Sequence, residues 1–179
     1  MFRSTLRVVA TLALVLTVLF PATGHAAPPL PGALPLDKAI RIGTGSKVVI
    51  EFSDPDCPFS RRMVRYWDLR NDVTRYVFLV TLSNHPDAPQ KARYILAAKN
   101  KPAAYRSVLQ GGLDFEDLDQ RRFDDHGLLA LHRAVAARLG VIGTPTYFIN
   151  GVEVNGAKVK KIETLLGGAK IPFDVKDPD

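Results

Sequence analysis

The sequence predicts an α/β fold, and three features in the first half of the chain carry this prediction. Residues 47–52 (KVVIEF) form a mostly apolar, β-branched run between turn residues, which is typical of a strand. Pro58 follows shortly afterwards, and its fixed φ suits the first position of a helix. Residues 76–82 form a second apolar strand. Strand, helix and strand in this order favour a parallel βαβ unit with a right-handed crossover.

Helices are expected before, within and after this unit in the sequence. Residues 36–42 predict a short helix ahead of the first strand, and the helix that begins at Pro58 is expected to end near residue 70. Two more helices, 90–99 and 102–110, are expected between the second strand and a glycine pair, because proline can open a helix and glycine commonly ends one. These two helices would form an insertion in the α/β fold.

A longer helix and a hairpin are expected in the last third of the chain. Asp124 or Asp125 is expected to cap a helix that runs to Leu139, since apolar residues recur there at spacings of three and four. An Asn-Gly pair at 150–151 separates two short strands, and this dipeptide is preferred in a two-residue type I′ hairpin turn. The last helix is expected over residues 158–166.

The first 26 residues have the features of a secretory signal peptide. Arg3 and Arg7 give a positive start, residues 8–20 are a mostly apolar run, and residues 24–26 supply small side chains for cleavage. An uncleaved membrane anchor is the alternative, but a membrane span needs about 20 apolar residues. We therefore expect residues 1–26 to be removed, and the mature protein to be periplasmic or secreted from a bacterial cell.

The remaining boundaries follow from composition. Residues 27–46 are expected to be a Pro-rich leader, because four prolines within 27–35 make this segment stiff and leave it without a core of its own. We expect the α/β domain over residues 47–170 and a C-terminal tail over 171–179.

The charge of the chain argues against nucleic-acid binding. Lysine and arginine number 24 and aspartate and glutamate 18, which gives a net charge of +6. These basic residues are spread along the sequence, whereas nucleic-acid-binding domains usually concentrate them on one face. No nucleic-acid partner is therefore expected.

The histidines and the cysteine do not predict a metal site. The chain has four histidines and one cysteine, and no two histidines have the H-x-x-x-H spacing. We therefore expect no metal ion and no cofactor. Surface or capping roles are expected for the histidines, of which His85 lies in a Pro-rich loop from which it can approach the active-site face.

Cys57 is the single cysteine of the sequence, so no disulfide can form within the chain. Its thiol is buried and inert, paired with another molecule, or reactive. The place of Cys57 before Pro58 favours a reactive thiol, because free backbone N–H groups at a helix N-terminus stabilise a thiolate. Asp54 and Asp56 oppose this effect if their carboxylates point toward the sulfur.

Two motifs resemble those of a known family. Residues 52–60 (FSDPDCPFS), together with 143–146 (GTPT), are similar to the catalytic domain of the DsbC/DsbG-like thioredoxin-fold thiol:disulfide interchange family. The similarity extends over most of residues 47–167. It implies a thioredoxin-like α/β fold with a helical insertion and a cis-proline loop. The active-site motif implied by the resemblance consists of Cys57, Pro58, Phe59 and Ser60.

The resemblance also implies roles for residues outside that motif. The Thr144–Pro145 peptide bond would be cis and would face Cys57, where the loop offers backbone groups to an extended substrate segment. An ordinary turn proline is the alternative. The family often places a buried acid six residues before the cysteine, where it moves protons for a second active-site cysteine. Glu51 has this position here, and a solvated carboxylate at the sheet edge is its alternative role.

The sequence departs from the family's C-x-x-C motif, because Ser60 replaces the second cysteine. Ser60 is placed to hydrogen-bond the sulfur but cannot resolve a mixed disulfide. Isomerisation needs no second thiol, because the substrate's own thiol can expel Cys57. We therefore expect an exported monothiol enzyme that isomerises or reduces protein disulfides through a mixed disulfide at Cys57. Its partners would be protein or peptide thiols and disulfides, together with an external thiol or a membrane reductase.

Two other functions remain as alternatives. One is a non-catalytic peptide-binding or chaperone module of an envelope or secretion assembly. The other is an iron–sulfur site, since C-P-F-S is similar to the C-G-F-S motif of monothiol glutaredoxins, although the export signal argues against it. DsbC-like proteins dimerise through a separate N-terminal domain, for which residues 27–46 are too few. No oligomeric state is predicted.

Overall fold

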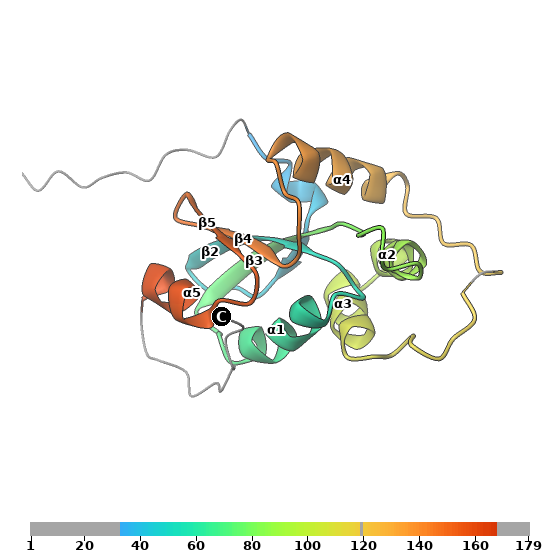
Figure 1. Cartoon of the computed structure of the whole chain (residues 1–179), viewed down its shortest axis with the longest axis horizontal. Helices are drawn as coiled ribbons and strands as arrows, with labels where there is room; N and C mark the ends of the chain where they lie inside the picture. Colours follow the sequence, from blue (N-terminus) through green and yellow to red (C-terminus); the bar gives the residue numbers. More distant parts are fainter. Residues whose placement is uncertain (1–32, 119, 168–179) are drawn as a thin grey trace, which may run out of the picture.

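The computed structural model describes residues 33–118 and 120–167. The expected signal peptide (1–26) and C-terminal tail (171–179) lie outside the described residues. The described part of the chain forms a sheet with helices packed on both faces, which confirms the expected α/β fold (Figure 1).

The sheet consists of five strands within the described residues. These are β1 (Ile40–Ile42), β2 (Lys47–Ser53), β3 (Val73–Leu79), β4 (Thr146–Ile149) and β5 (Val152–Asn155). Their order across the sheet is β1-β3-β2-β4-β5, with β2 and β3 parallel and the other neighbours antiparallel. The parallel pair is joined by helix α1 (Pro58–Asp68), which confirms the predicted βαβ unit.

Strand β3 begins at Val73, three residues before the predicted start at residue 76. It pairs with β2 along its whole length, beginning with Lys47 opposite Val73. Arg75 interrupts the apolar pattern here, but its guanidinium lies 2.6 Å from the carboxylate of Glu51. The predicted start was wrong because a charged residue can occupy a buried strand position when a neighbouring strand supplies its partner.

The short helix predicted over residues 36–42 is wrong for its second half. Leu36–Lys38 form a single 3₁₀ turn, and Ile40–Ile42 form strand β1. Ile40 is buried and lies opposite Val77 of β3. This strand lies within the segment assigned to the leader. It is a strand and not a helix because pairing with the edge of β3 decides the conformation of so short a segment.

The helices that follow β3 agree with the sequence in number and order. They are α2 (Ala88–Ala97), α3 (Lys101–Leu109), α4 (Leu128–Arg138) and α5 (Val159–Leu166). The predicted insertion is α2 and α3. Helix α4 starts later than predicted, because Gly127 before it has φ +78°, yet the carboxylate of Asp125 still accepts the Leu129 N–H at 2.7 Å.

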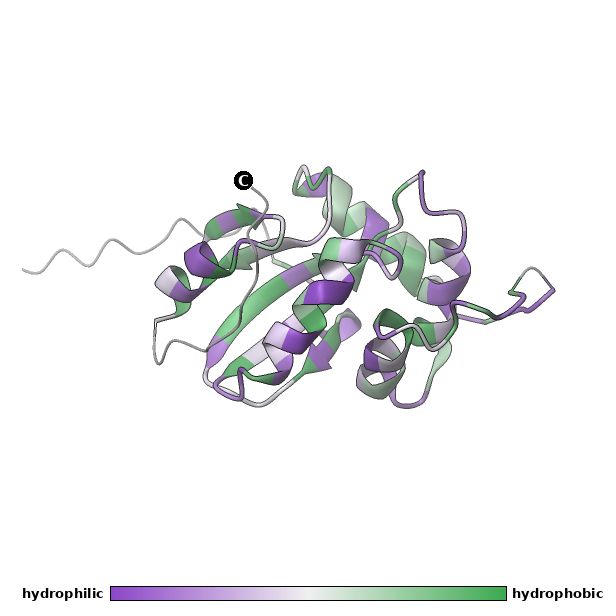
Figure 2. Ribbon diagram, turned by 60° about the horizontal axis from the view of Figure 1, so that its bottom comes forward, coloured by the Kyte–Doolittle hydropathy of each residue, from purple (hydrophilic) through white to green (hydrophobic). Residues whose placement is uncertain are grey.

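Three apolar clusters join the helices to the sheet. Helices α1 and α5 pack against β2 and β4, α4 packs against β2 and β3, and α2 and α3 pack against β1 and β3. Figure 2 shows hydrophobic residues along the central strands and hydrophilic residues on the outer surfaces of the helices. Among residues 33–118 and 120–167, no helix has the length and apolarity that a membrane span requires.

His132 of α4 is fully buried and connects three parts of the fold. Its Nδ1 accepts the backbone N–H of Leu79 in β3 at 2.9 Å, so the ring proton lies on Nε2. Nε2 donates to the Lys38 carbonyl at 2.9 Å. Burial lowers the pKa of His132, partly offset by the hydrogen bond with Lys38. The imidazole is therefore a neutral structural group.

This burial predicts that the protein loses stability in mild acid. The pKa of an unfolded histidine is about 6.5, and the folded pKa of His132 is lower, so the unfolded state binds more protons below pH 6.5. Stability is complete above that pH and falls as the pH drops below it. Urea unfolding at pH 7.5 and 5.5 should differ by up to about 1.4 kcal/mol.

A matched pair of variants identifies the histidine responsible. His126→Gln replaces a ring that is 80% exposed, and it should keep the full difference between the two pH values. His132→Gln should be less stable and should lose most of the difference. A His132→Gln variant that retained the whole pH dependence would contradict this assignment.

Candidate active site

Cys57 lies at the N-terminus of α1, with Pro58 as the first residue of the helix. The backbone N–H of Cys57 donates to the Asp54 carbonyl at 3.2 Å, and the Cys57 carbonyl accepts the N–H of Arg61 at 3.0 Å. Residue Cys57 is only 3% exposed. The helix start predicted from the sequence is confirmed, and the thiol lies just beneath the surface at that point.

The thiol of Cys57 contacts the loop that precedes β4. Its Sγ donates a hydrogen bond to the carbonyl oxygen of Thr144 at 3.1 Å, although the two residues are 87 positions apart. The Thr144–Pro145 peptide bond is cis. The hydroxyl of Thr146 donates to the Gly143 carbonyl at 2.8 Å, which ties the two sides of this loop together.

Two hydroxyl groups near the thiol lack hydrogen bonds within the described residues. Ser60 Oγ and Thr144 Oγ1 are both buried and have no partner there. The expected hydrogen bond from Ser60 to the sulfur is therefore absent, and the thiol itself donates to the Thr144 carbonyl. Buried hydroxyls without partners cost free energy, so both groups are available to a bound substrate or to an ionised sulfur.

An apolar groove of about 370 Å³ lies beside the Thr144–Pro145 loop. Two apolar side chains on its walls are exposed to solvent, Phe59 by 40% and Ile142 by 92%. Asn155 and Lys158 add polar groups to its lining. The groove includes Thr144, so a bound chain would lie next to the residue that contacts the thiol.

Glu51 lies in the core under the sheet and is fully buried, which excludes a solvated carboxylate. One of its oxygens is 2.6 Å from the Arg75 guanidinium, and the other accepts the hydroxyl of Tyr105 at 3.0 Å. Burial raises the pKa of Tyr105 well above its usual value, so the phenol stays protonated and donates. Both oxygens of Glu51 are thus occupied by Arg75 and Tyr105, neither of which the sequence reading identified.

Asp54 anchors the loop before Cys57 and was missed as a structural residue. Its carboxylate is fully buried and accepts the N–H of Asp56 and the N–H of Leu82, each at 2.7 Å. His85 Nδ1 lies 3.0 Å from the same carboxylate, so His85 reaches the active-site loop. The Asp-Pro-Asp sequence was an available signal, because aspartate commonly bonds the backbone two residues later.

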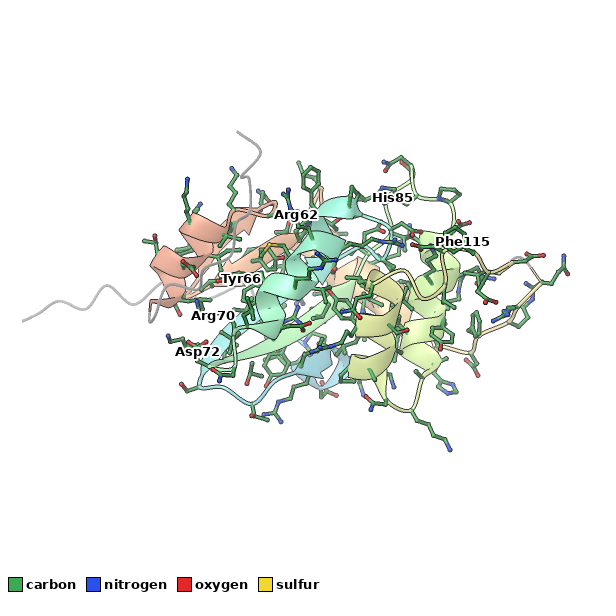
Figure 3. All side chains as sticks on the ribbon, turned by 90° about the horizontal axis from the view of Figure 1, so that it is seen from below. Arg62, Tyr66, Arg70, Asp72, His85 and Phe115 are labelled. Atoms are coloured by element: carbon green, nitrogen blue, oxygen red, sulfur yellow. The ribbon has the colours of Figure 1, made fainter. Side chains whose placement is uncertain are left out.

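Asp56, the residue before Cys57, is bound by two cations. Its Oδ1 lies 2.6 Å from Lys91 Nζ of α2 and 2.7 Å from Arg61 Nη2 of α1. Figure 3 shows Arg62 and Tyr66 in succession along α1 and Arg70 just after the helix, with the end that carries Arg62 directed toward His85. The start of α1 and the loop after β3 therefore meet at one edge of the molecule.

Known proteins are similar to this chain in sequence. The family model described as a thioredoxin-like domain matches residues 18–166. A Bordetella pertussis protein named "Probable thiol:disulfide interchange protein DsbC" is 30% identical over 127 residues, which cover 69% of this chain and 43% of that protein. The chain thus spans less than half the length of this relative.

Solved structures show the same fold. A disulfide interchange protein from Neisseria gonorrhoeae has 28% sequence identity and a TM-score of 0.59, with 74% of this chain and 99% of that chain covered. ScsC of Proteus mirabilis in a compact conformation has 17% identity and a TM-score of 0.59, with 72% and 71% covered. These likenesses confirm the thioredoxin-like fold class expected from the sequence.

The buried ion pair of Glu51 and Arg75 predicts a large effect on stability. Glu51→Gln should lower the free energy of unfolding by about 3 kcal/mol, because the Arg75 charge would stay in the core without a carboxylate. Urea denaturation measures the loss. The double variant Glu51→Gln/Arg75→Met removes both charges and should recover at least half of it.

An exposed ion pair provides the comparison. Arg106 and Asp68 are 2.7 Å apart, with side chains 54% and 25% exposed. Arg106→Gln should therefore cost less than about 1 kcal/mol. If Glu51→Gln were as mild as Arg106→Gln, the buried pair would not hold the core together as described.

Proposed function

This chain belongs to the thioredoxin-like domain family, and on that basis we propose that it is an exported monothiol protein that exchanges protein disulfides through Cys57. One observation carries the proposal: the thiol lies at the start of α1 and 3.1 Å from the Thr144 carbonyl of the cis-proline loop. In this proposal Cys57 is the nucleophile, and the loop beside it offers backbone groups to an extended chain.

The proposed reaction is thiol–disulfide exchange. The Cys57 thiolate attacks one sulfur of a substrate disulfide, forms a mixed disulfide, and releases the other sulfur as a thiolate. The released substrate thiolate can attack another substrate disulfide and free a new substrate thiolate. A substrate thiolate finally attacks the substrate sulfur of the mixed disulfide, forms a substrate disulfide and expels Cys57 as a thiolate. The substrate disulfides are rearranged and no electrons are gained or lost. Net reduction would need two electrons from an external thiol or a membrane reductase.

The serine at position 60 limits which disulfide reactions the protein can complete. A hydroxyl cannot attack the mixed disulfide, so the protein cannot release its substrate by forming an internal disulfide. Oxidation by such a disulfide is therefore outside its chemistry. Isomerisation, in which the substrate supplies the resolving thiol, is the reaction that one cysteine can complete.

The proposed reaction requires that a substrate disulfide can reach the Cys57 sulfur. Because Cys57 is 3% exposed, neighbouring side chains have to move before a disulfide can reach the sulfur. We place the substrate in the groove lined by Phe59, Ile142 and Thr144, where the apolar side chains of Phe59 and Ile142 are exposed. Thr144 and Pro145 would hold the backbone of the substrate, and Glu51 would act through its ion pair with Arg75 as a support of β2 and β3.

The setting of this function is also proposed. Removal of residues 1–26 would leave the protein in the periplasm or outside the cell, where disulfides form and persist. Its partners would be proteins or peptides with thiols and disulfides, and an external thiol or a membrane reductase would keep Cys57 reduced. The names of the similar Bordetella and Neisseria proteins support this chemistry.

Cys57→Ser should reduce the refolding rate of a scrambled disulfide-bonded protein to the rate in the glutathione buffer alone, because no other thiol exists in the chain. Regain of substrate activity over time measures this loss. Unchanged refolding by Cys57→Ser would sink the proposal. Peptide binding retained by that inactive variant would point to the peptide-holding module instead.

Substitutions at position 60 test the monothiol mechanism. With a disulfide-containing peptide and no added thiol, the natural protein should accumulate a mixed disulfide that a non-reducing gel detects. Ser60→Cys should clear it, since a second thiol near Cys57 resolves the bond. Ser60→Ala is the matched control and should accumulate the mixed disulfide as the natural protein does. Equal accumulation in all three would contradict the role assigned to position 60.

A further inference from the structure

A network of four charged side chains joins the loop before Cys57 to the helical insertion. Lys91 of α2 lies 2.6 Å from Asp56 Oδ1 and 2.9 Å from Asp114 Oδ1. Arg61 of α1 lies 2.7 Å from the same oxygen of Asp56, and its two terminal nitrogens reach both oxygens of Asp114. Each cation thus bridges the same two carboxylates.

Water screens the ion pairs least at Lys91 and Asp56, whereas Arg61 and Asp114 at the outer side of the network are 24% and 27% exposed. Residue Lys91 is 4% exposed, and the side chain of Asp56 is 17% exposed. Burial by itself lowers the pKa of Lys91, but the hydrogen bonds with Asp56 and Asp114 outweigh it and the net shift is upward. The hydrogen bond from Arg61 holds the pKa of Asp114 well below its usual range. Lys91, Arg61 and Asp114 are therefore charged near neutral pH.

Asp56 depends on these two cations. Its second oxygen, Oδ2, is buried and has no hydrogen-bond partner within the described residues. The charge of this carboxylate is thus balanced only through Oδ1, by Lys91 and Arg61. Asp56 is bonded directly to Cys57, and an unbalanced carboxylate there would disfavour ionisation of the thiol.

We propose that Lys91 and Arg61 are positioning residues of the Cys57 site, which neutralise Asp56 and so let the neighbouring thiol ionise. The proposal rests on the function proposed above only in that Cys57 is the reacting group. In this proposal the helical insertion affects the active site, because α2 supplies Lys91 and the segment after α3 supplies Asp114. No contact with substrate is involved.

The other charged groups around this loop are accounted for by contacts of their own. Asp54 is bound by two backbone N–H groups and lies beside His85. Asp114 faces Asp56 across the two cations and holds them in place. Among these groups, Asp56 alone combines direct attachment to Cys57 with dependence on cations from other elements.

Titration of the single thiol tests this proposal. Thiolate absorbance at 240 nm is followed against pH, and the spectrum of the corresponding Cys57→Ser protein is subtracted. Lys91→Met should move the midpoint up by about one pH unit, because Asp56 loses half of its compensation. Asp56→Asn should move it down. The double variant Asp56→Asn/Lys91→Met should return to within about 0.3 of a pH unit of the natural protein.

The two single variants distinguish an effect of charge from an effect of packing, because an effect of charge shifts their titration midpoints in opposite directions. Loosening of the loop would move both single variants in the same direction, and that result overturns the proposal, as does an unmoved midpoint in Lys91→Met. Arg106→Gln, which removes a cation paired with Asp68 away from this loop, should leave the midpoint unchanged. If Lys91→Met does not fold, Asp56→Asn decides alone, and a raised or unchanged midpoint is the contrary result. Because the titration requires no disulfide exchange, it can fail or succeed independently of the proposed activity.

Discussion

The hydrogen bond between the Cys57 thiol and the Thr144 carbonyl is the contact on which the site depends. It exists because β2 and β4 are antiparallel neighbours, with Phe52 opposite Thr146. The loop that leaves β2 and the loop that enters β4 therefore lie at the same edge of the sheet. A shift in this register would separate the thiol from the cis-proline loop while leaving each segment locally intact.

The helical insertion contributes directly to this edge. Tyr105 of α3 reaches through the core to Glu51 and Ser53 of β2. Lys91 of α2 binds Asp56, the residue before Cys57, and Asp114 after α3 binds both Lys91 and Arg61. The insertion thus holds both the strand that leads to the thiol and the loop that carries it, rather than only covering one side of the sheet.

A site with one cysteine needs different polar groups around it than a site with two. A second active-site cysteine would need a proton acceptor, whereas Glu51 is committed to Arg75 and Tyr105 in the core. The hydroxyls of Ser60 and Thr144 are buried and have no hydrogen-bond partner within the part of the chain that the structure describes. Such hydroxyls can gain hydrogen bonds when a polar or charged group comes within reach.

Local signals in the sequence were sufficient for much of this protein. Apolar runs predicted the strands of the βαβ unit, and proline and glycine signals predicted the insertion. Pro58 placed Cys57 at a helix start, and the Asn-Gly pair at 150–151 predicted the hairpin, where both residues have positive φ. Each of these depends on residues close together in the chain, so their physical preferences can be read directly.

Long-range pairing decided the rest. Strand β1 and the early start of β3 exist because a neighbouring strand completes their hydrogen bonds, which no local preference reveals. Asp56 and Lys91 are 35 residues apart, and their pairing follows from the packing of α2 beside the reactive loop. The sequence by itself determined the fold class and the place of the thiol. Only the tertiary structure decided which side chains and carbonyl groups surround the thiol. These groups come from segments far apart in the sequence, and they come together only when the sheet has formed.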